Sequence, residues 1–147
     1  MADIPELVTN IHRLSIVLGR IGDNALQTDC GYGMSQFKIL WVLMTHEEGV
    51  LQTTIASWLN QTEAAISRQV GLLDEEGLIT KQVDPQTRRN HIVRLSTKGK
   101  KLATNAMSVL AKEYKPNFAV LSDNEQELLN ALLEKVFYTV CARNLED

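Results

Sequence analysis

The sequence has only two cysteines, Cys30 and Cys141, which lie far apart and form no Cys-x-x-Cys pair. This scarcity excludes a disulfide framework and a structural zinc site built on paired thiolates, and it is typical of a reducing compartment. The three histidines, His12, His46 and His91, fall in three unrelated segments. We therefore expect no shared metal site.

Long apolar runs and catalytic motifs are missing as well. No segment approaches the ~18 consecutive apolar residues that a membrane-spanning helix needs, and the first residues, MADIPELV, lack the basic and apolar regions of a signal peptide. The sequence has no G-x-S-x-G, P-loop, dinucleotide-binding glycine motif, H-E-x-x-H or paired catalytic carboxylates. We expect a cytoplasmic protein that is not an enzyme and has no cofactor and no membrane partner.

What the sequence does contain is an uneven distribution of charge. The stretch from Asp84 to Lys101, DPQTRRNHIVRLSTKGKK, has six Lys or Arg and one acid, and therefore a formal charge of +5 in a chain whose net charge is −3. The other 129 of the 147 residues carry −8, so the pI of about 5.6 averages an acidic body with a basic patch. Such a patch indicates a polyanionic partner.

Hydrophobic periodicity predicts a mainly α-helical domain with a small β-hairpin. Helices are expected over about 4–22, 35–48, 52–60, 62–76 and 98–115, and from residue 122 onward, with a short extended piece at 50–51. A tight turn containing Asn60 joins the third and fourth helices, and Thr62 can cap the fourth. Two helices so joined form a helix-turn-helix. Strands over 78–83 and 90–96 then form a hairpin, and Thr97 can cap the helix that ends before Pro116.

The fourth helix carries the side chains that are candidates for reading DNA bases. Spacing of about 100° per residue turns Ile66, Val70 and Leu73 to the core. The opposite side is small and polar enough to enter a major groove about 12 Å wide. Candidate contacts are Arg68 to guanine or phosphate, Ser67 to either, and two alanines to thymine methyl groups, beside the capping threonine: Thr62, Ala64, Ala65, Ser67 and Arg68. The alternative is an ordinary solvent-facing surface.

The hairpin and the start of the next helix carry the remaining candidates. Arg88 and Arg89 lie at the hairpin tip, where they can contact phosphates or the minor groove. Lys98, Lys100 and Lys101 lie at a helix N-terminus, where the helix dipole disfavours cations. Lys98 is therefore a candidate DNA contact, although a plain solvated face is the alternative.

Four features follow one another in residues 65–102. They are a helix-turn-helix, a Gly77-Leu78 pair where the chain leaves the recognition helix, a wing with arginines at its tip and the motif Leu95-Ser-Thr-Lys-Gly99, in the sequence AISRQVGLLDEEGLITKQVDPQTRRNHIVRLSTKGKKL. In this order of features the chain resembles the MarR (multiple antibiotic resistance regulator) family over essentially its whole length. The resemblance implies a winged helix-turn-helix repressor that binds a pseudo-palindromic operator as a homodimer and is released by a small aromatic or phenolic effector. It also implies a single domain over 1–147, with dimerisation helices in 1–30 and 116–147 and a DNA-binding lobe over about 34–102.

The resemblance transfers the family's key wing arginine to Arg89, followed by Arg88. Thr87 stands where the family usually has aspartate, so a carboxylate that supports Arg89 is lost or must come from Asp84. The family's ligand pocket would lie near His12, Tyr32, Met34, Phe37 and Trp41, but no ligand-binding residue is assigned.

Two alternative functions remain open at this stage. One is redox control through Cys30, which we expect in a glycine-containing loop, while Cys141 is expected to be buried. The other is a winged-helix protein-interaction module without DNA binding. Gly71, inside the recognition helix, costs about 1 kcal/mol relative to alanine, which indicates either a close approach to a partner or a loosened helix.

Overall fold

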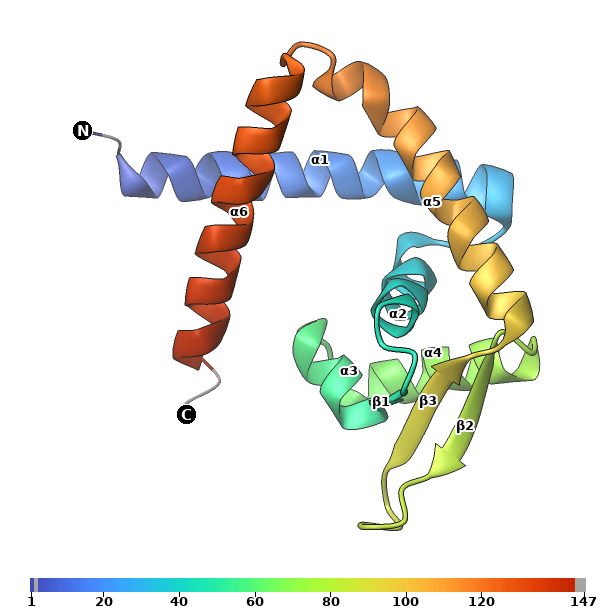
Figure 1. Cartoon of the computed structure of the whole chain (residues 1–147). Coiled ribbons are helices and arrows are strands. Elements are labelled where there is room, and N and C mark those ends of the chain that lie inside the picture. Colours follow the sequence, from blue (N-terminus) through green and yellow to red (C-terminus); the bar gives the residue numbers. More distant parts are fainter. Residues whose placement is uncertain (2, 145–147) are drawn as a thin grey trace. The chain divides into compact units, whose positions relative to one another are not determined.

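The computed structural model describes residue 1 and residues 3–144, which form two compact units, Met1–Ala111 and the segment from Lys112 onward (Figure 1). The elements are α1 (Ile4–Cys30), α2 (Met34–Met44), β1 (Val50–Leu51), α3 (Gln52–Trp58), α4 (Glu63–Glu75), β2 (Ile79–Val83), β3 (His91–Leu95), α5 (Thr97–Phe118) and α6 (Asp123–Asn144). The fold is mainly α with a small β-hairpin, as predicted. None of the helices in the described ranges has the length and apolar character to cross a membrane.

The three strands form one antiparallel sheet in the order β1-β3-β2. The predicted hairpin pairs Ile79 with Leu95 and Val83 with His91. On the other edge of β3, Val50 pairs with Val93. The short extended piece before α3 is therefore the third strand, and it attaches the hairpin to the helix-turn-helix.

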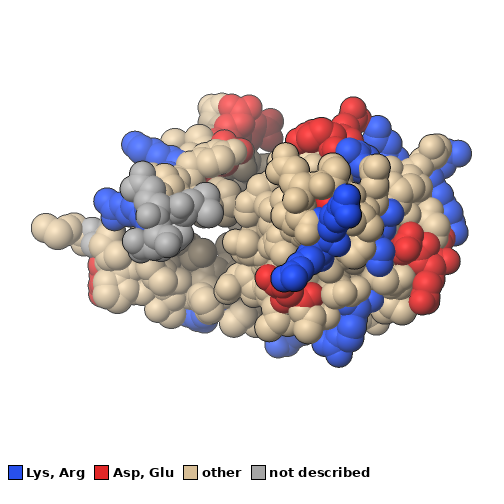
Figure 2. All heavy atoms as spheres, turned by 90° about the horizontal axis from the view of Figure 1, so that it is seen from below, with Lys and Arg blue, Asp and Glu red and all other residues tan. Residues whose placement is uncertain are grey.

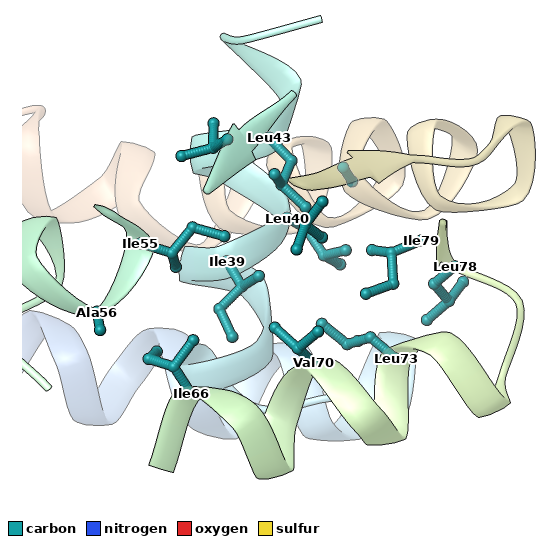
Figure 3. Close-up of a cluster of buried hydrophobic side chains, with 13 residues drawn as sticks. Ile39, Leu40, Leu43, Ile55, Ala56, Ile66, Val70, Leu73, Leu78 and Ile79 are labelled. Atoms are coloured by element: carbon teal, nitrogen blue, oxygen red, sulfur yellow. The ribbon is translucent and has the colours of Figure 1, made fainter. Parts of the chain in front are cut away.

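The core of the first unit lies between α2, α3, α4 and the sheet. Figure 3 shows Ile39 of α2 between Ile55 of α3 and the side chains of α4. The predicted inward face of α4 is confirmed, because Ile66, Val70 and Leu73 are each at most 1% exposed. Full burial of such a side chain contributes about 1.5–3 kcal/mol, so this stripe holds α4 in place and leaves its opposite side to solvent.

Helix α1 is longer than the sequence predicted. Its periodicity indicated an end near Gly22, but the helix continues to Cys30 and stops at Gly31, whose φ is 73° and whose N–H donates to the Gln27 carbonyl. A glycine inside a helix costs only about 1 kcal/mol, which the burial of nearby Leu26 offsets. Cys30 is thus the last residue of a helix, and its predicted place in a loop is wrong.

The ends of α2 and α5 also differ from the prediction. Helix α2 ends at Met44, four residues early, where the Thr45 hydroxyl donates to the Val42 carbonyl. Helix α5 continues through Pro116 to Phe118, although proline cannot donate the regular hydrogen bond to the carbonyl four residues earlier. The helix thus extends three residues beyond the end that Pro116 predicted.

The first turn of α5 is capped by a different residue from the one predicted. The hydroxyl of Ser96, not that of Thr97, accepts the N–H of Gly99 at 3.0 Å. Ser96 therefore occupies the capping position, one residue earlier along the chain.

The second unit contains the end of α5 and all of α6. The predicted capping box is confirmed, because Ser122 N–H donates to the Glu125 carboxylate at 2.8 Å and Glu125 N–H donates to the Ser122 hydroxyl at 3.4 Å. The Ser122 N–H and the Ser122 hydroxyl both donate to the Glu125 carboxylate, and these bonds lower the pKa of Glu125. Along α6, large apolar side chains are exposed: Leu128, Leu132, Leu133, Val136 and Phe137.

Candidate DNA-binding surface

The turn between α3 and α4 is built from local backbone signals. Asn60 has a φ of 50°, a conformation that asparagine tolerates better than most residues, and Gln61 N–H donates to the Ala56 carbonyl at 2.9 Å. Thr62 then caps α4, since its hydroxyl accepts the N–H of Ala65 at 3.1 Å. The turn and the cap lie where the sequence predicted them, and together they fix the start of α4.

The outer face of α4 is open near its N-terminus. Ala64, Ser67 and Arg68 are exposed and Ala65 is half-buried, so four predicted contacts share one accessible region with Thr62. Within the described ranges the one ion pair joins Lys100 to Glu47, so the Arg68 guanidinium has no ionic partner there. Small side chains around one unpaired guanidinium are suited to a major groove.

The wing loop, residues 84–90, is organised by one buried carboxylate. Asp84 is 6% exposed, and its carboxylate accepts the Gln86 N–H at 3.1 Å and the Thr87 hydroxyl at 3.2 Å. Its carbonyl accepts the Arg88 N–H at 2.9 Å. Asp84 makes no ion pair with Arg89, so it supports the loop backbone, and neither Arg88 nor Arg89 has an ion pair among the described residues.

The hairpin tip presents two guanidinium groups. Arg88 and Arg89 are both exposed, and Arg88 has a φ of 56°, a strained conformation for a residue with a side chain. Figure 2 views the molecule from below, the direction in which the hairpin tip projects, and shows Lys and Arg side chains over this face with acidic groups among them. The tip is therefore a local positive feature on a surface of mixed charge.

A side-chain contact that the sequence did not reveal joins the wing to the helix-turn-helix. The Asn90 amide donates to the Thr53 hydroxyl of α3 at 2.7 Å, while the Asn90 carboxamide oxygen accepts the His91 N–H at 2.9 Å. Asn90 and Thr53 are 37 positions apart in the sequence, and no local pattern connects them.

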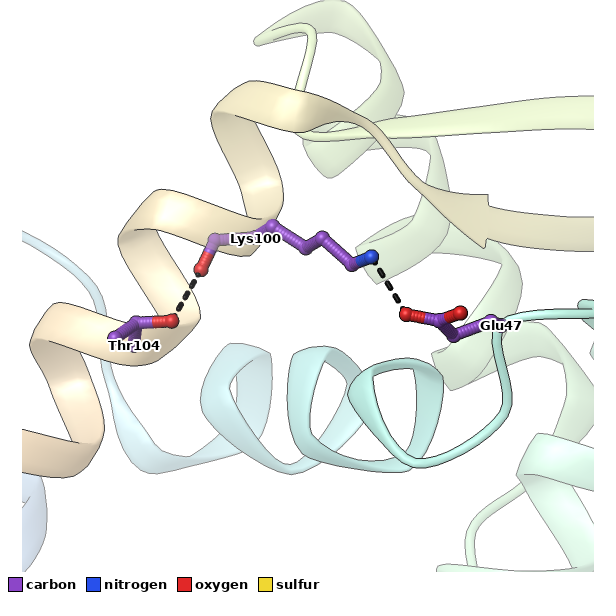
Figure 4. Close-up of polar contacts among 3 residues, drawn as sticks. All are labelled: Glu47, Lys100 and Thr104. Carbon is purple, nitrogen blue, oxygen red and sulfur yellow. Dashed lines mark hydrogen bonds and ion pairs between the residues drawn. The ribbon is translucent and has the colours of Figure 1, made fainter.

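The lysines at the start of α5 have partners inside the protein. The Lys98 ammonium donates to the Glu76 carbonyl at the C-terminus of α4 at 2.7 Å, the opposite end of that helix from Thr62. Lys100 pairs with Glu47 at 2.7 Å and lowers its pKa (Figure 4). Contacts within the chain therefore account for part of the positive charge at the start of α5, for which the sequence indicated a DNA partner. Lys98 is the weakest of the predicted DNA contacts.

The surroundings of Cys30 do not activate its thiol. Burial raises the pKa of Cys30, the nearby Asp29 charge raises it further, and a hydrogen bond from Asn105 at 3.6 Å opposes both. A raised pKa reduces the reactive thiolate. Cys141 is half-buried, less covered than predicted. The described part of the chain contains no cluster of three or more His, Cys, Asp or Glu suited to a metal ion.

Residues 36–114, which include α3, α4 and the wing, match the family described as winged helix DNA-binding domain. The chain belongs to this family. A Bacillus subtilis (strain 168) protein named as an uncharacterized HTH-type transcriptional regulator, YdgJ, is 25% identical over 105 residues; the match spans 71% of this chain and 64% of that protein's length.

Solved structures extend the similarity to nearly the whole chain. A MarR-family transcriptional regulator from Rhodococcus sp. RHA1 superimposes with a TM-score of 0.81 at 20% identity, covering 92% of this chain and 95% of the other. The Staphylococcus aureus MepR–DNA complex gives a TM-score of 0.71 at 24% identity, covering 95% of this chain and 99% of MepR. The MarR-type fold predicted from the sequence is confirmed, and within it the matched residues form a winged helix DNA-binding domain.

Proposed function

We propose that this protein is a transcriptional regulator of MarR type, a cytoplasmic repressor that binds a pseudo-palindromic operator as a homodimer. The observation that carries the proposal is the open N-terminal face of α4 in the same unit as a wing whose two exposed arginines make no ion pair within the described part of the chain. The recognition face, defined as Thr62, Ala64, Ala65, Ser67 and Arg68, enters the major groove. Arg88 and Arg89 contact phosphates or the adjacent minor groove.

The exposed apolar side chains on the first and last helices support the dimer. On α1 they are Ile4, Leu7, Val8, Ile11 and Leu14, and α6 adds its own exposed set from Leu128 to Phe137. Rows of exposed large apolar side chains along one helix are typical of protein interfaces. In a symmetric dimer the two recognition faces lie about one helical turn of DNA apart, roughly 34 Å, and enter successive major grooves.

Release by a small aromatic or phenolic effector is the regulatory part of the proposal. A ligand that changes the separation of the two recognition faces weakens binding, because the spacing of the half-sites is fixed by the DNA helix. Redox control through Cys30 is the less favoured alternative, since the raised pKa of that thiol lowers its reactivity.

The test is selection of random duplex DNA by the purified protein, repeated at several salt concentrations. We expect enrichment of an inverted repeat. Arg89→Ala weakens binding to all sequences alike and reduces the salt dependence, whereas Arg68→Ala also changes the base preference. Lys38→Ala, which removes an exposed positive charge from α2, is the matched control.

An absence of enrichment, with weak binding that does not depend on Arg89, would refute the proposal and favour a winged-helix protein-interaction module. Sedimentation of the free protein tests the dimer separately. A monomer at micromolar concentration would contradict the role of α1 and α6.

A further inference from the structure

The loop between α1 and α2, residues 31–33, is held in one geometry by hydrogen bonds on both sides. Gly31 closes α1 in the left-handed conformation. The Asp23 carboxylate accepts the Met34 N–H at 2.8 Å, and Gly33 N–H donates to the Gln36 side chain at 3.1 Å. The loop is thereby tied to the last turns of α1 and the first turn of α2.

Close packing restricts the loop further. A Cβ on Gly33 would lie 2.8 Å from one oxygen of Asp23, closer than real Cβ atoms come. The other oxygen of Asp23 accepts the Gln27 side-chain amide at 2.8 Å, which fixes the carboxylate from α1. A side chain carried by this loop is therefore presented from a rigid support.

That side chain is Tyr32, which is half-buried and reaches the far end of the recognition helix. Its hydroxyl donates to the Glu76 carboxylate, 44 residues away, at the C-terminal cap of α4. The Glu76 carbonyl accepts the Lys98 ammonium at 2.7 Å, and the Gly77 carbonyl accepts the Ser96 hydroxyl at 2.6 Å. The C-terminus of α4 is thus held from the start of α5 and, through Tyr32, from the α1 side.

We propose that Tyr32 is a positioning residue for operator recognition: it fixes the direction of α4 through Glu76 and so sets where the recognition face meets the bases. This inference rests on the proposed DNA-binding function. It adds a residue that contacts no base and lies outside both the recognition face and the wing.

A lever argument gives the size of the effect. Helix α4 has 13 residues and is therefore about 20 Å long, so a tilt of about 5° at its C-terminus moves its N-terminus by about 1.7 Å. Direct hydrogen bonds to base edges need donor–acceptor distances of about 2.7–3.2 Å, so such a shift breaks them. Arginine contacts to phosphates tolerate it, because the long side chains follow the backbone and the attraction is not specific to sequence.

The protonation state of Tyr32 is consistent with this role. The hydrogen bond to Glu76 raises the pKa of Tyr32, with burial and the Glu76 charge acting in the same direction. The phenol therefore stays protonated and donates throughout the neutral range.

The experiment compares Tyr32→Phe, Glu76→Ala and the double variant with wild type. Affinity is measured for the selected operator and for random duplex DNA of equal length, across a salt series. We expect Tyr32→Phe to lower operator affinity about fivefold, or about 1 kcal/mol, with random-DNA affinity and salt slope unchanged. The double variant should bind no more weakly than Glu76→Ala, because the two groups act as one pair. Glu75→Ala removes a neighbouring exposed carboxylate from the same end of α4, one that is not the partner of Tyr32, and serves as the control.

The outcomes separate this inference from the function on which it rests. If wild type shows no sequence-specific binding, the proposed function fails and the inference fails with it. If wild type is specific and Tyr32→Phe keeps the same ratio of operator to random-DNA affinity, the inference alone is overturned. Equal losses on both DNAs would show general destabilisation, and additive losses in the double variant would show that Tyr32 and Glu76 act independently; either result would also overturn it.

Discussion

Substitution of Gly99 by alanine should destabilise the fold strongly, although alanine is the better helix former. Gly99 lies in the first turn of α5 against the chain that leaves the recognition helix. A Cβ at this position would lie 1.9 Å from the carbonyl oxygen of Leu78, and 3.2 Å from a methyl group of Leu95. This explains why the Leu-x-x-x-Gly motif after the wing ends in glycine.

The cost follows from how far the helix must move. Ordinary contact with the added carbon begins near 3.4 Å, so α5 and the Leu78 carbonyl must separate by about 1.5 Å. That movement breaks the 3.1 Å bond from Ser96 N–H to the Leu78 carbonyl, which costs about 1–3 kcal/mol for an unsatisfied buried group. Overpacking adds about 1–3 kcal/mol, and helix propensity returns less than 1 kcal/mol. The net loss is about 3 kcal/mol.

Gly71→Ala is the matched control for this prediction. Gly71 lies in the middle of α4, and an added Cβ meets nothing within 4 Å. There the same change should raise the free energy of unfolding by about 0.5–1 kcal/mol. Urea denaturation of both variants and wild type at one protein concentration measures the two effects. Equal stability of Gly99→Ala and wild type would refute the packing argument, and a destabilised Gly71→Ala would refute the control.

Three other perturbations have defined outcomes. Asp84→Ala removes the buried acceptor of the wing loop, so DNA affinity should fall although Arg88 and Arg89 are intact. Unchanged affinity in a gel-shift titration would show that the wing loop does not need the Asp84 carboxylate. The pKa of Tyr32 is raised in the folded state, so its stabilising contribution is present below the ordinary tyrosine pKa of about 10 and is lost as pH rises through the higher folded value. Above pH ~10 the stability of wild type should therefore fall more steeply than that of Tyr32→Phe, as followed by circular dichroism. Cys30 should react with iodoacetamide at pH 7.5 more slowly than free cysteine, because its pKa is raised, and faster labelling would revive the redox alternative.

The features that the sequence predicted well have local causes. The 3.6-residue period placed Ile66, Val70 and Leu73 on one buried face, because residues at this spacing lie on the same side of a helix and are buried together. Asn60 and Thr62 identified the turn and the cap, since each satisfies backbone groups within four residues of itself. Signals of this kind need no knowledge of the rest of the chain.

What could not be predicted depends on residues that are distant in sequence. Whether α1 continues past Gly22 depends on the burial of Leu26, and the neighbours that bury it are supplied by the fold. The same holds for the tie between Asn90 and Thr53, which has no local signal. The sequence could nominate the candidate DNA contacts and the local turn and cap beside them, but it could not reveal the long-range contacts that help to position them.

The lysines of the basic stretch show how contacts between distant residues change the prediction of DNA binding. Lys98 and Lys100 donate to partners within the chain, so the charge available to DNA is smaller than the formal +5. Each phosphate contact contributes about −0.9 to the slope of log K against log salt. The four wing arginines of the proposed dimer therefore give a slope of about −3.6. The slope becomes about −5.4 if Lys101 of each subunit also contacts phosphate. If Lys98 and Lys100 bound DNA as well, the slope would approach about −9. A measured slope near that value would mean that both lysines leave their internal partners on binding, and that the C-terminus of the recognition helix is released on the operator instead of being held there.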